Sequence, residues 1–317
     1  MSFQIVGTGR ANPALVLTNE MVSKLVDTND EWIVTRTGIN TRYVSTDETL
    51  LDLSVEAANN ALNKAGIEGK DLDLIICSTL EGDYITPSLS CLVQREIGAV
   101  CPAVDINAAC SGFIYGLDMA DAYITSDKAE TILLIGAEMM TRHLDWKDRS
   151  TCVLFGDGAG AVVLKKGNGL KSIKITAKGD DKLLVIGNVF CSSPFSNQPQ
   201  TDPHFRMNGG EVFKFAVGSA LRDVKEVMKK AGVTVSDVKM LIPHQANLRV
   251  SQFVKEKMGF SDEQLASAID HYGNTSSASI PLLLDELVEE GKLSSGDIIV
   301  LTAFGGGLTT GACVIEL

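Results

Sequence analysis

Three residues of the chain combine side-chain types and positions that suit acyl transfer: Cys110, His244 and Asn274. Cys110 follows a predicted strand at 103–107 and opens a predicted helix, whose partial positive charge favours a thiolate and lowers the thiol pKa. His244 comes directly after a predicted strand at 239–242, and Asn274 lies in a turn before another predicted helix. A thiolate with an imidazole donor and an amide donor fits acyl transfer through a stabilised oxyanion or enolate.

Each of the three residues also has a structural interpretation. A cysteine in an apolar segment is most often a small buried residue, and this is the interpretation we give to the other six cysteines. A lone histidine is more often a structural hydrogen-bonding group than a catalyst, and asparagine commonly caps a helix or forms a turn. His244 lies past a strand end, where functional groups collect, which favours a catalytic role. The histidines at 143, 204 and 271 have no such setting.

The glycine-rich segment 303–311 follows the last predicted strand. Glycine allows backbone N–H groups to approach a reacting oxygen closely. Neither this segment nor GTGRAN near the N-terminus opens the GxGxxG helix of a dinucleotide site. The chain also has no Walker motif, no HExxH motif and no paired-carboxylate signature. Its motifs therefore favour acyl transfer over nucleotide or metal chemistry.

The elements that would position these residues occur twice in the chain. Segments 51–66 and 217–232 share one helical spacing of apolar residues, both end in Lys-Ala-Gly, and lie 166 residues apart (217 − 51). Offsets of 161 to 167 relate further strands and helices. Alternating strands and helices predict α/β layers with mostly parallel sheets. We expect a half at 1–165 carrying the nucleophile and a half at 166–317 carrying His244 and Asn274, packed about a pseudo-twofold axis. Chance similarity of generic strand–helix units is the alternative.

Composition narrows the class of protein further. The 317 residues are 45% hydrophobic and 21% charged, which allows a large core. A net charge of −12 argues against a nucleic-acid partner. No secretion signal opens the sequence, and no apolar run is long enough to cross a bilayer. Seven cysteines without a CxxC pair fit a reducing cytosol better than a disulfide framework or a zinc site. We therefore expect a cytoplasmic protein without metal or membrane.

The segments DINAACSGF, IPHQANLR, HYGNTSSASIP and AFGGG resemble the β-ketoacyl-carrier-protein synthase III family in order and spacing. The segments NDEWIVTRTGI and DRSTCVLFGDGAGAVVL extend the resemblance to essentially the whole chain. The resemblance implies α/β thiolase-like duplicated halves in a layered αβαβα architecture. It disfavours thiolases, which carry a second cysteine where Ala303-Phe304 stands, and elongating synthases, which have a histidine in place of Asn274. Hydroxymethylglutaryl-CoA synthases need a glutamate before the Cys110 segment that has no match here.

The resemblance implies a decarboxylative Claisen condensation that initiates fatty acid synthesis. Cys110 would take an acyl group from acyl-CoA, with the backbone N–H groups of Cys110 and Gly306 as the oxyanion hole. His244 and Asn274 would stabilise the enolate that forms when malonyl-acyl-carrier protein loses carbon dioxide. Acyl-CoA is then a substrate, no cofactor is expected, and the family implies a homodimer.

Several binding residues are implied in the same way. Trp32 and Arg149 resemble the pair that sandwiches the adenine of CoA, Arg36 a phosphate contact and Asn247 a pantetheine contact. The basic residues expected to receive the acidic carrier protein are Lys214, Arg249 and Lys257. A solvated basic edge is the other interpretation of these three.

The acyl pocket shows a departure from the family pattern. Members that prime with very short acyl groups often have a bulky aromatic residue where Thr86 stands, at a position that bounds the pocket across the dimer interface. Threonine predicts a roomier pocket that accepts chains longer than acetyl. Four larger residues are candidates to refill this space: Met140, Phe155, Phe205 and Phe304.

Two other functions stay open. A sister enzyme of secondary metabolism would use the same acyl-cysteine to make C–C, C–O or C–N bonds. A non-catalytic acyl-CoA-binding paralogue is the second alternative, and the intact Cys110, His244 and Asn274 argue against it because binding needs none of them.

Overall fold

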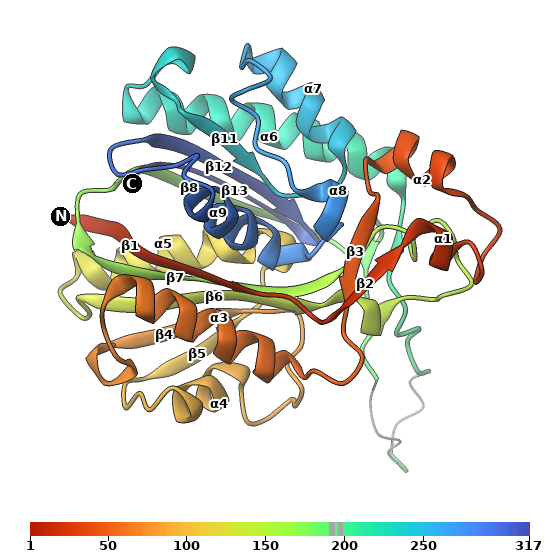
Figure 1. Cartoon of the computed structure of the whole chain (residues 1–317), viewed down its shortest axis with the longest axis horizontal. Helices are drawn as coiled ribbons and strands as arrows, with labels where there is room; N and C mark the ends of the chain where they lie inside the picture. The colour runs from red at the N-terminus through yellow and green to blue at the C-terminus, as the bar shows by residue number, and fades with distance from the viewer. Residues whose placement is uncertain (190–193, 196–198) are drawn as a thin grey trace.

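The computed structural model describes residues 1–189, 194–195 and 199–317, and its elements form five alternating layers (Figure 1). Helices α5 (Gly112–Thr125) and α9 (Ser279–Glu289) lie between two sheets. The outer layers are α3 (Leu50–Ala65) with α4 (Leu89–Glu96) on one side, and α6 (Gly209–Ala231) with α7 (Leu248–Met258) on the other. The predicted αβαβα layering is confirmed.

The two sheets repeat one pairing pattern. Their strand orders are β1-β7-β6-β4-β5 and β8-β13-β12-β11. β4 pairs parallel with β6 as β11 does with β12, and the next two pairings in each sheet are antiparallel. β5, parallel to β4, is the extra strand and forms an outer edge. The bounds are β1 (Ser2–Ala11), β4 (Leu74–Ser78), β5 (Ala103–Ile106), β6 (Thr131–Met139), β7 (Asp157–Gly167), β8 (Leu170–Asp180), β11 (Met240–Pro243), β12 (Ile298–Gly305) and β13 (Gly307–Glu316).

The expectation of mostly parallel sheets is wrong. β6 is followed by β7, and β12 by β13, without a crossover helix between them, so each pair runs antiparallel. The matching pairings support an internal repeat, whereas the division at 165 and 166 stays a prediction. In the structure β7 continues to Gly167 and β8 begins at Leu170.

Shorter elements gather mainly at one end of the layers, at the right of Figure 1. They are β2 (Leu15–Thr18), α1 (Asn19–Val22), α2 (Asp30–Thr37), β3 (Thr41–Val44), β9 (Leu184–Val185), β10 (Arg206–Met207) and α8 (Ile269–Tyr272). Short 3₁₀ turns are η1 (Gly69–Asp71), η2 (Ala109–Ser111), η3 (Met140–His143), η4 (Val235–Asp237) and η5 (Ser276–Ala278). Among the described residues, no helix is both long and apolar enough to span a membrane.

The central helices are held from both sides. Phe113 and Leu117 of α5 and Leu283 of α9 belong to one buried cluster that also contains side chains from both sheets. A helix that is apolar on most of its surface requires this kind of enclosure. The outer helices are amphipathic instead, and α3 and α6 both end at the predicted glycines, Gly66 and Gly232, in left-handed conformation. The central layer therefore fixes where α5 and α9 begin.

The cysteines follow the sequence expectation with one exception. Cys77, Cys101, Cys152 and Cys313 are buried and unpaired. Cys91 is exposed on α4, so its assignment as a buried apolar residue is wrong. It occupies an outward position on a helix whose other face packs on the sheet. Cys191 lies outside the described residues.

A buried carboxylate on α9 joins elements from the two ends of the chain. Asp285 accepts hydrogen bonds from Thr8 Oγ1 at 2.6 Å, from Arg10 Nη1 at 2.7 Å and from Lys64 Nζ at 2.6 Å. Its side chain is only 1% exposed, whereas Glu289, which pairs with the same two cations, is 46% exposed. Asp285 therefore ties α9 to β1 and α3.

Asp285→Asn should lower the free energy of unfolding by about 3 kcal/mol, because it removes the negative charge from a buried ion pair and turns an NH₂ group towards a cation. Denaturant unfolding measures this change. The matched variant Glu289→Gln should cost less than about 1 kcal/mol, since an exposed pair is screened by solvent. Equal losses in the two variants would contradict the role of burial.

Candidate active site

The central helices begin at two turns with the same unusual backbone. Ala109, just before Cys110, has a φ of 47°, and Ser276 has a φ of 49°. Left-handed values are uncommon outside glycine and mark local strain. The two residues are 167 apart (276 − 109), and each opens a 3₁₀ turn that leads into α5 or α9. The two turns contact each other, and Ser276 Oγ lies within hydrogen-bonding distance of Cys110 Sγ, at 3.4 Å.

Cys110, His244 and Asn274 line one cavity of about 900 Å³. The cavity also includes Gly306 and Phe304 and extends to Trp32, Arg36 and Asn247. The structure therefore brings together residues from both predicted halves. As the sequence predicted, Cys110 lies at the turn that leads into α5, and His244 directly follows the end of β11.

His244 follows β11 and is fixed by its backbone. Its N–H donates to the Thr302 carbonyl at 2.7 Å, and its ring meets the Phe304 ring edge-to-face at 5.5 Å between centroids. The side chain is buried, and its Nδ1 has no hydrogen-bond partner among the described residues. Burial lowers the pKa of His244 to about 3. The imidazole is therefore neutral at pH 7 and can donate from only one ring nitrogen.

Asn274 is held in an extended segment beside Phe155. Its backbone N–H donates to Leu154 O at 2.9 Å, and its carbonyl accepts from Gly156 N at 3.1 Å. The side-chain Oδ1 accepts from Ser276 N at 2.9 Å. Because Oδ1 is engaged in this way, the Nδ2 group is the part of the amide available to donate into the cavity.

The Cys110 thiol differs from the sequence expectation. Burial raises its pKa to about 12, opposed by the hydrogen bond from Ser276 and assisted by the nearby Glu138 carboxylate. The predicted lowering of this pKa is therefore wrong. The sulfur lies in an enclosed layer, where loss of hydration outweighs the favourable helix terminus. Cys110 is a neutral thiol at pH 7.

The glycine-rich segment passes directly against Cys110. A Cβ atom at Gly305 would lie 2.6 Å from Cys110 N, so no larger residue fits there. Gly306 follows in the cavity wall. Backbone rather than side chain therefore borders the sulfur on this side, as an oxyanion site requires.

Glu138 was missed by the sequence analysis. It lies near the end of β6, is 2% exposed, and accepts hydrogen bonds from Ser276 Oγ, Ser277 Oγ and Leu80 N. Burial raises its pKa to about 7, although these hydrogen bonds oppose the shift. The available signal was an acidic residue inside the otherwise apolar strand sequence TILLIGAEM.

Three of the predicted CoA residues, Trp32, Arg36 and Asn247, line the cavity, and Arg149 contacts Trp32 without lining the cavity itself. The guanidinium carbons of Arg36 and Arg149 are 4.6 and 5.1 Å from the centre of the Trp32 ring. Arg149 also donates to the Asp27 carbonyl at 2.8 Å. Asn247 caps α7 with its Oδ1 and donates from Nδ2 to the Arg36 carbonyl at 3.0 Å. An adenine between Trp32 and Arg149 would have to separate a stack that is closed here.

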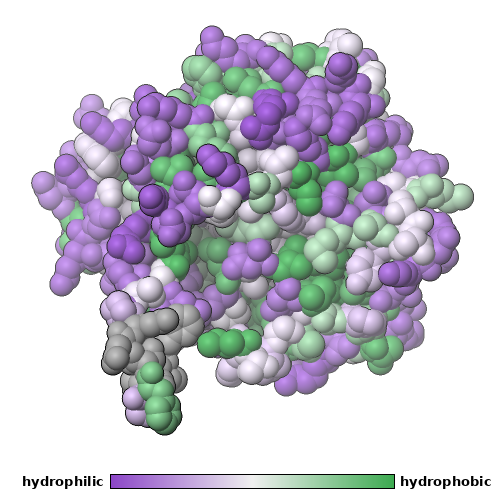
Figure 2. Space-filling view, turned by 180° about the vertical axis from the view of Figure 1, so that it is seen from behind, coloured by the Kyte–Doolittle hydropathy of each residue, from purple (hydrophilic) through white to green (hydrophobic). Residues whose placement is uncertain are grey.

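The predicted carrier-protein residues lie on the outer helices α6 and α7. Lys214 pairs with Glu211 at 2.8 Å, and Lys257 lies over the Phe253 ring at 5.4 Å. Arg249 is exposed on the same helix as Lys257. Figure 2 shows apolar residues among hydrophilic ones over this end of the molecule. The three cations thus lie on the same outer layer of the structure.

Four of the five predicted acyl-pocket residues line the cavity: Met140, Phe155, Phe205 and Phe304. The Phe155 and Phe205 rings meet edge-to-face at 4.7 Å. Thr86 is exposed and does not line the cavity of its own chain, although Tyr84 and Ile85 do. Thr86 follows Ile85 in the loop between β4 and α4. A role for Thr86 therefore requires a second subunit.

The three remaining histidines differ in whether they line the cavity. His143 lines the cavity with its Nε2 3.6 Å from Glu81, and burial lowers its pKa. His204 pairs with Asp202, and His271 pairs with Asp270 and Glu286. Neither His204 nor His271 lines the cavity.

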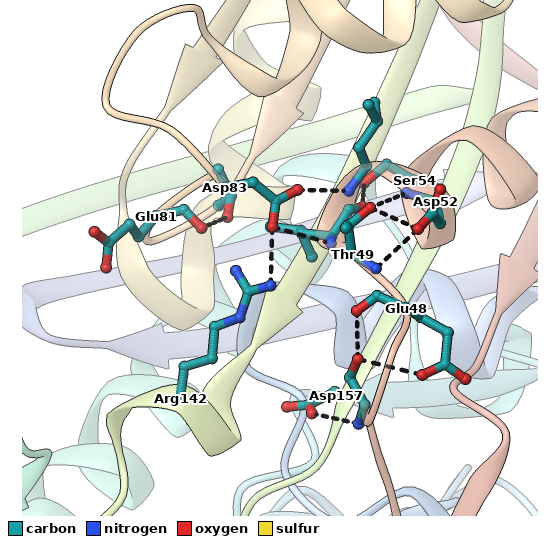
Figure 3. Close-up of polar contacts among 12 residues, drawn as sticks. Glu48, Thr49, Asp52, Ser54, Glu81, Asp83, Arg142 and Asp157 are labelled. Carbon is teal, nitrogen blue, oxygen red and sulfur yellow. Dashed lines mark hydrogen bonds and ion pairs between the residues drawn. The ribbon is translucent and has the colours of Figure 1, made fainter.

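The loop after β4 is anchored through Asp83 (Figure 3). One Asp83 oxygen accepts from Leu51 N at 3.0 Å, at the start of α3, and the other lies 2.9 Å from Arg142 Nη2. Figure 3 shows the Asp83 carboxylate between the helix start and the Arg142 side chain. Because Glu81–Ile85 contributes to the cavity wall, this carboxylate holds part of that wall in place.

Comparison with protein families and curated proteins gives a consistent result. Residues 104–180 match the family model described as 3-oxoacyl-[acyl-carrier-protein (ACP)] synthase III, and residues 228–317 match that of its C-terminal part. The chain is 46% identical over 321 residues to β-ketoacyl-[acyl-carrier-protein] synthase III of Aquifex aeolicus, covering 100% of both chains. It is 44% identical over 322 residues to the protein of the same name from Clostridium perfringens, covering 99% of each.

Solved structures show the same similarity. The crystal structure of 3-oxoacyl-[acyl-carrier-protein] synthase III from Aquifex aeolicus matches with a TM-score of 0.94 at 45% identity, covering 99% of this chain and 100% of that one. A priming β-ketosynthase from a polyketide biosynthetic pathway matches with a TM-score of 0.93 at 33% identity, covering 100% of this chain and 96% of that one.

Asp83→Ala should speed hydrogen–deuterium exchange in residues 79–87 about tenfold and cost about 1 kcal/mol of stability, because the loop and the start of α3 lose a shared acceptor. Mass-spectrometric exchange measures the loop directly. The control is Asp52→Ala, which removes the capping contact with Thr49 on the same helix but does not touch the loop. Faster loop exchange in both variants would show that Asp83 acts only through helix stability.

Proposed function

Since the chain belongs to the β-ketoacyl-[acyl-carrier-protein] synthase III family, we propose that its cavity is where an acyl-CoA primer is condensed with malonyl-acyl-carrier protein, with Cys110 as the nucleophile. The family comprises condensing acyltransferases that initiate fatty acid synthesis, and the fold is the thiolase-like αβαβα architecture. The observation that carries the assignment of residues is the single cavity shared by Cys110, His244, Asn274 and Gly306.

In the first half-reaction, Cys110 Sγ attacks the thioester carbonyl of acyl-CoA. The backbone N–H groups of Cys110 and Gly306 donate to the oxyanion that forms, and the C–S bond to coenzyme A then breaks. The close approach of Gly305 to Cys110 supports this arrangement, because it leaves backbone rather than side chains beside the reacting carbon.

In the second half-reaction, the malonyl group loses carbon dioxide and leaves an enolate at its thioester. His244 and Asn274 donate hydrogen bonds to the enolate oxygen, and its carbon attacks the acyl-Cys110 carbonyl to give the β-ketoacyl-carrier protein. A neutral His244 suits this step, because a fixed uncharged donor acts more strongly in a buried site than in bulk solvent.

The substrates would reach Cys110 from one side of the molecule. Trp32, Arg36, Arg149 and Asn247 would bind the nucleotide and pantetheine parts of CoA, since three of them line the cavity and Arg149 stacks on Trp32. Lys214, Arg249 and Lys257 would receive the acidic carrier protein. A cavity of about 900 Å³ walled by Met140, Phe155, Phe205 and Phe304 supports primers longer than acetyl.

We further propose a cytoplasmic homodimer that uses acyl-CoA as substrate and needs no separate cofactor. β5 forms the outer edge of its sheet, with no further strand beside it among the described residues, and the apolar side chains of Val100, just before it, and Val104, within it, are exposed. An open apolar edge favours pairing with a second copy. That contact would bring Thr86 to the cavity of the second copy. Each copy would contain both halves, 1–165 and 166–317.

A role in secondary metabolism is the second candidate, supported by the similarity to a priming β-ketosynthase of a polyketide pathway. Its chemistry on Cys110 would be the same, and the carrier protein that delivers the extender would differ. Activity with the malonyl-carrier protein of fatty acid synthesis separates the two.

Intact-protein mass spectrometry after incubation with acetyl-, isobutyryl-, hexanoyl- and decanoyl-CoA should show an adduct of one acyl mass. We expect hexanoyl-CoA to label the wild-type protein at least as fast as acetyl-CoA, because the cavity accommodates the longer chain. Cys110→Ala should bind CoA but give no adduct. An adduct that survives in Cys110→Ala, or no adduct with any primer, would overturn the proposed covalent step.

His244→Ala and Asn274→Ala should slow decarboxylation of malonyl-carrier protein by about 10²-fold, the usual loss for one oxyanion donor. Acylation of Cys110 should change by less than about threefold, since neither side chain is required for that step. Single-turnover acylation and carbon dioxide release measure the two half-reactions separately. Equal losses in both would show that the roles are assigned wrongly.

A further inference from the structure

The half-buried Cys110 thiol must lose its proton before it can attack a thioester. No cation forms an ion pair with it among the described residues, and the buried His244 strongly resists gaining a proton. The described contacts of the sulfur include one polar side chain, Ser276, whose Oγ lies 3.4 Å away. The path of the proton therefore starts at Ser276.

Ser276 connects Cys110 to a buried carboxylate. Its Oγ lies 3.1 Å from Glu138 Oε1, so sulfur, hydroxyl and carboxylate form a continuous chain. A hydroxyl has one proton to donate and lone pairs to accept with. When Ser276 donates to Glu138, its oxygen is free to accept the proton of Cys110.

Glu138 is suited to receive that proton. Ser277 Oγ donates to it at 2.7 Å, and Leu80 N, on the loop after β4, donates at 3.0 Å. The titratable group that faces it from η2 is Cys110, and no cation within the described residues pairs with it from β4, β6 or η5. Without a cation to hold it ionised, the carboxylate changes protonation near neutral pH.

The backbone of Ser276 adopts an uncommon conformation that fixes the position of its hydroxyl. Its left-handed φ is unfavourable for a non-glycine residue, and such strain persists where the surrounding structure enforces it, commonly at functional sites. The corresponding strained residue in the first half is Ala109, which precedes Cys110. The turn in the first half thus carries the Cys110 sulfur, and the corresponding turn in the second half carries the Ser276 hydroxyl that contacts it.

We propose that Ser276 and Glu138 form a proton relay that activates Cys110 for acyl transfer. The S–H proton passes to Ser276 Oγ while the Ser276 proton passes to Glu138 Oε1. The sulfur forms its bond to the thioester carbon, the C–S bond to coenzyme A breaks, and the proton held by Glu138 leaves with the coenzyme A thiol. This inference rests on the proposed acyl-CoA reaction.

The relay avoids the cost of creating charge in the buried site. Before transfer the negative charge lies on the Glu138 carboxylate, and afterwards it lies on the Cys110 sulfur, so the pair keeps one charge throughout. Direct ionisation of Cys110 beside an ionised Glu138 would place two negative charges in the same enclosed layer, which is strongly unfavourable.

The test is the pH dependence of single-turnover acyl transfer, measured from pH 5.5 to 9 with whichever of the four CoA thioesters labels the wild-type protein fastest. The wild-type rate should rise with pH and level off above about pH 7, where Glu138 is ionised and able to accept a proton. Glu138→Gln and Ser276→Ala should be about 10²-fold slower at pH 7.5, the usual contribution of a general base. Their rates should keep rising up to pH 9, since only solvent then removes the proton.

Two matched variants separate the relay from structural effects. Ser277→Ala removes another Glu138 contact without touching Cys110, so its rate should still level off, but at higher pH, because the lost hydrogen bond stabilised the carboxylate. Ser276→Gly removes the hydroxyl while accepting the left-handed φ, so it should be as slow as Ser276→Ala with an unchanged or higher Tm.

Three results would overturn the relay. One is acyl transfer in Ser276→Gly within twofold of wild type. Another is a faster rate in Glu138→Gln, which would mean that Glu138 acts only as a repelling charge. The third is loss of the levelling-off in Ser277→Ala, which would indicate general disruption of the turn. Failure of the wild-type protein to acylate at all would instead reject the proposed function.

Discussion

The loss of hydration in the central layer is the constraint on which the site depends. Helices α5 and α9 are covered by a sheet on each side, so the groups at their starts are largely withdrawn from water and reach it only through the cavity. Burial acts in the same sense on every titratable group there, since it favours the uncharged form. It raises the pKa of Cys110 to about 12, raises that of Glu138 to about 7 and lowers that of His244 to about 3. Burial therefore favours the uncharged forms of Cys110 and His244 at neutral pH.

The same enclosure explains how the geometry is maintained. The turns at Ala109 and Ser276 adopt strained backbone conformations that an open loop would relax. They persist because the helices that follow them are packed into one core with both sheets. Asp285 adds a polar tie between α9 and elements near the N-terminus. Stability and reactivity thus depend on the same layer.

Much of the layering could be predicted from the sequence, because apolar spacing and strand–helix alternation repeat along the chain. The positions of Cys110 and His244 followed from the rule that functional groups collect at strand ends. The antiparallel pairs were missed because β7 and β13 had not been recognised as strands that return directly beside β6 and β12.

The electrostatics of the site were harder to predict. A helix start predicts a lowered thiol pKa for Cys110, yet the opposing loss of hydration depends on packing between sheets that are distant in sequence. Glu138 was overlooked for a similar reason, since its partners Ser276 and Ser277 lie more than a hundred residues away. Local sequence patterns indicate helix or strand propensity and the position of a residue, whereas the pKa of a side chain depends on all the groups packed around it.

The closed stack of Arg36, Trp32 and Arg149 has a kinetic consequence. A purine cannot occupy the space between Trp32 and Arg149 until the guanidinium moves away, and Arg149 is also tethered to the Asp27 carbonyl. Under the proposed binding of CoA at this stack, the affinity for the nucleotide thioester would be lowered in proportion to the fraction of molecules in which the stack is open. Association would then be gated, and the opening rate of Arg149 would set an upper limit on how quickly the proposed primer is captured at high concentration.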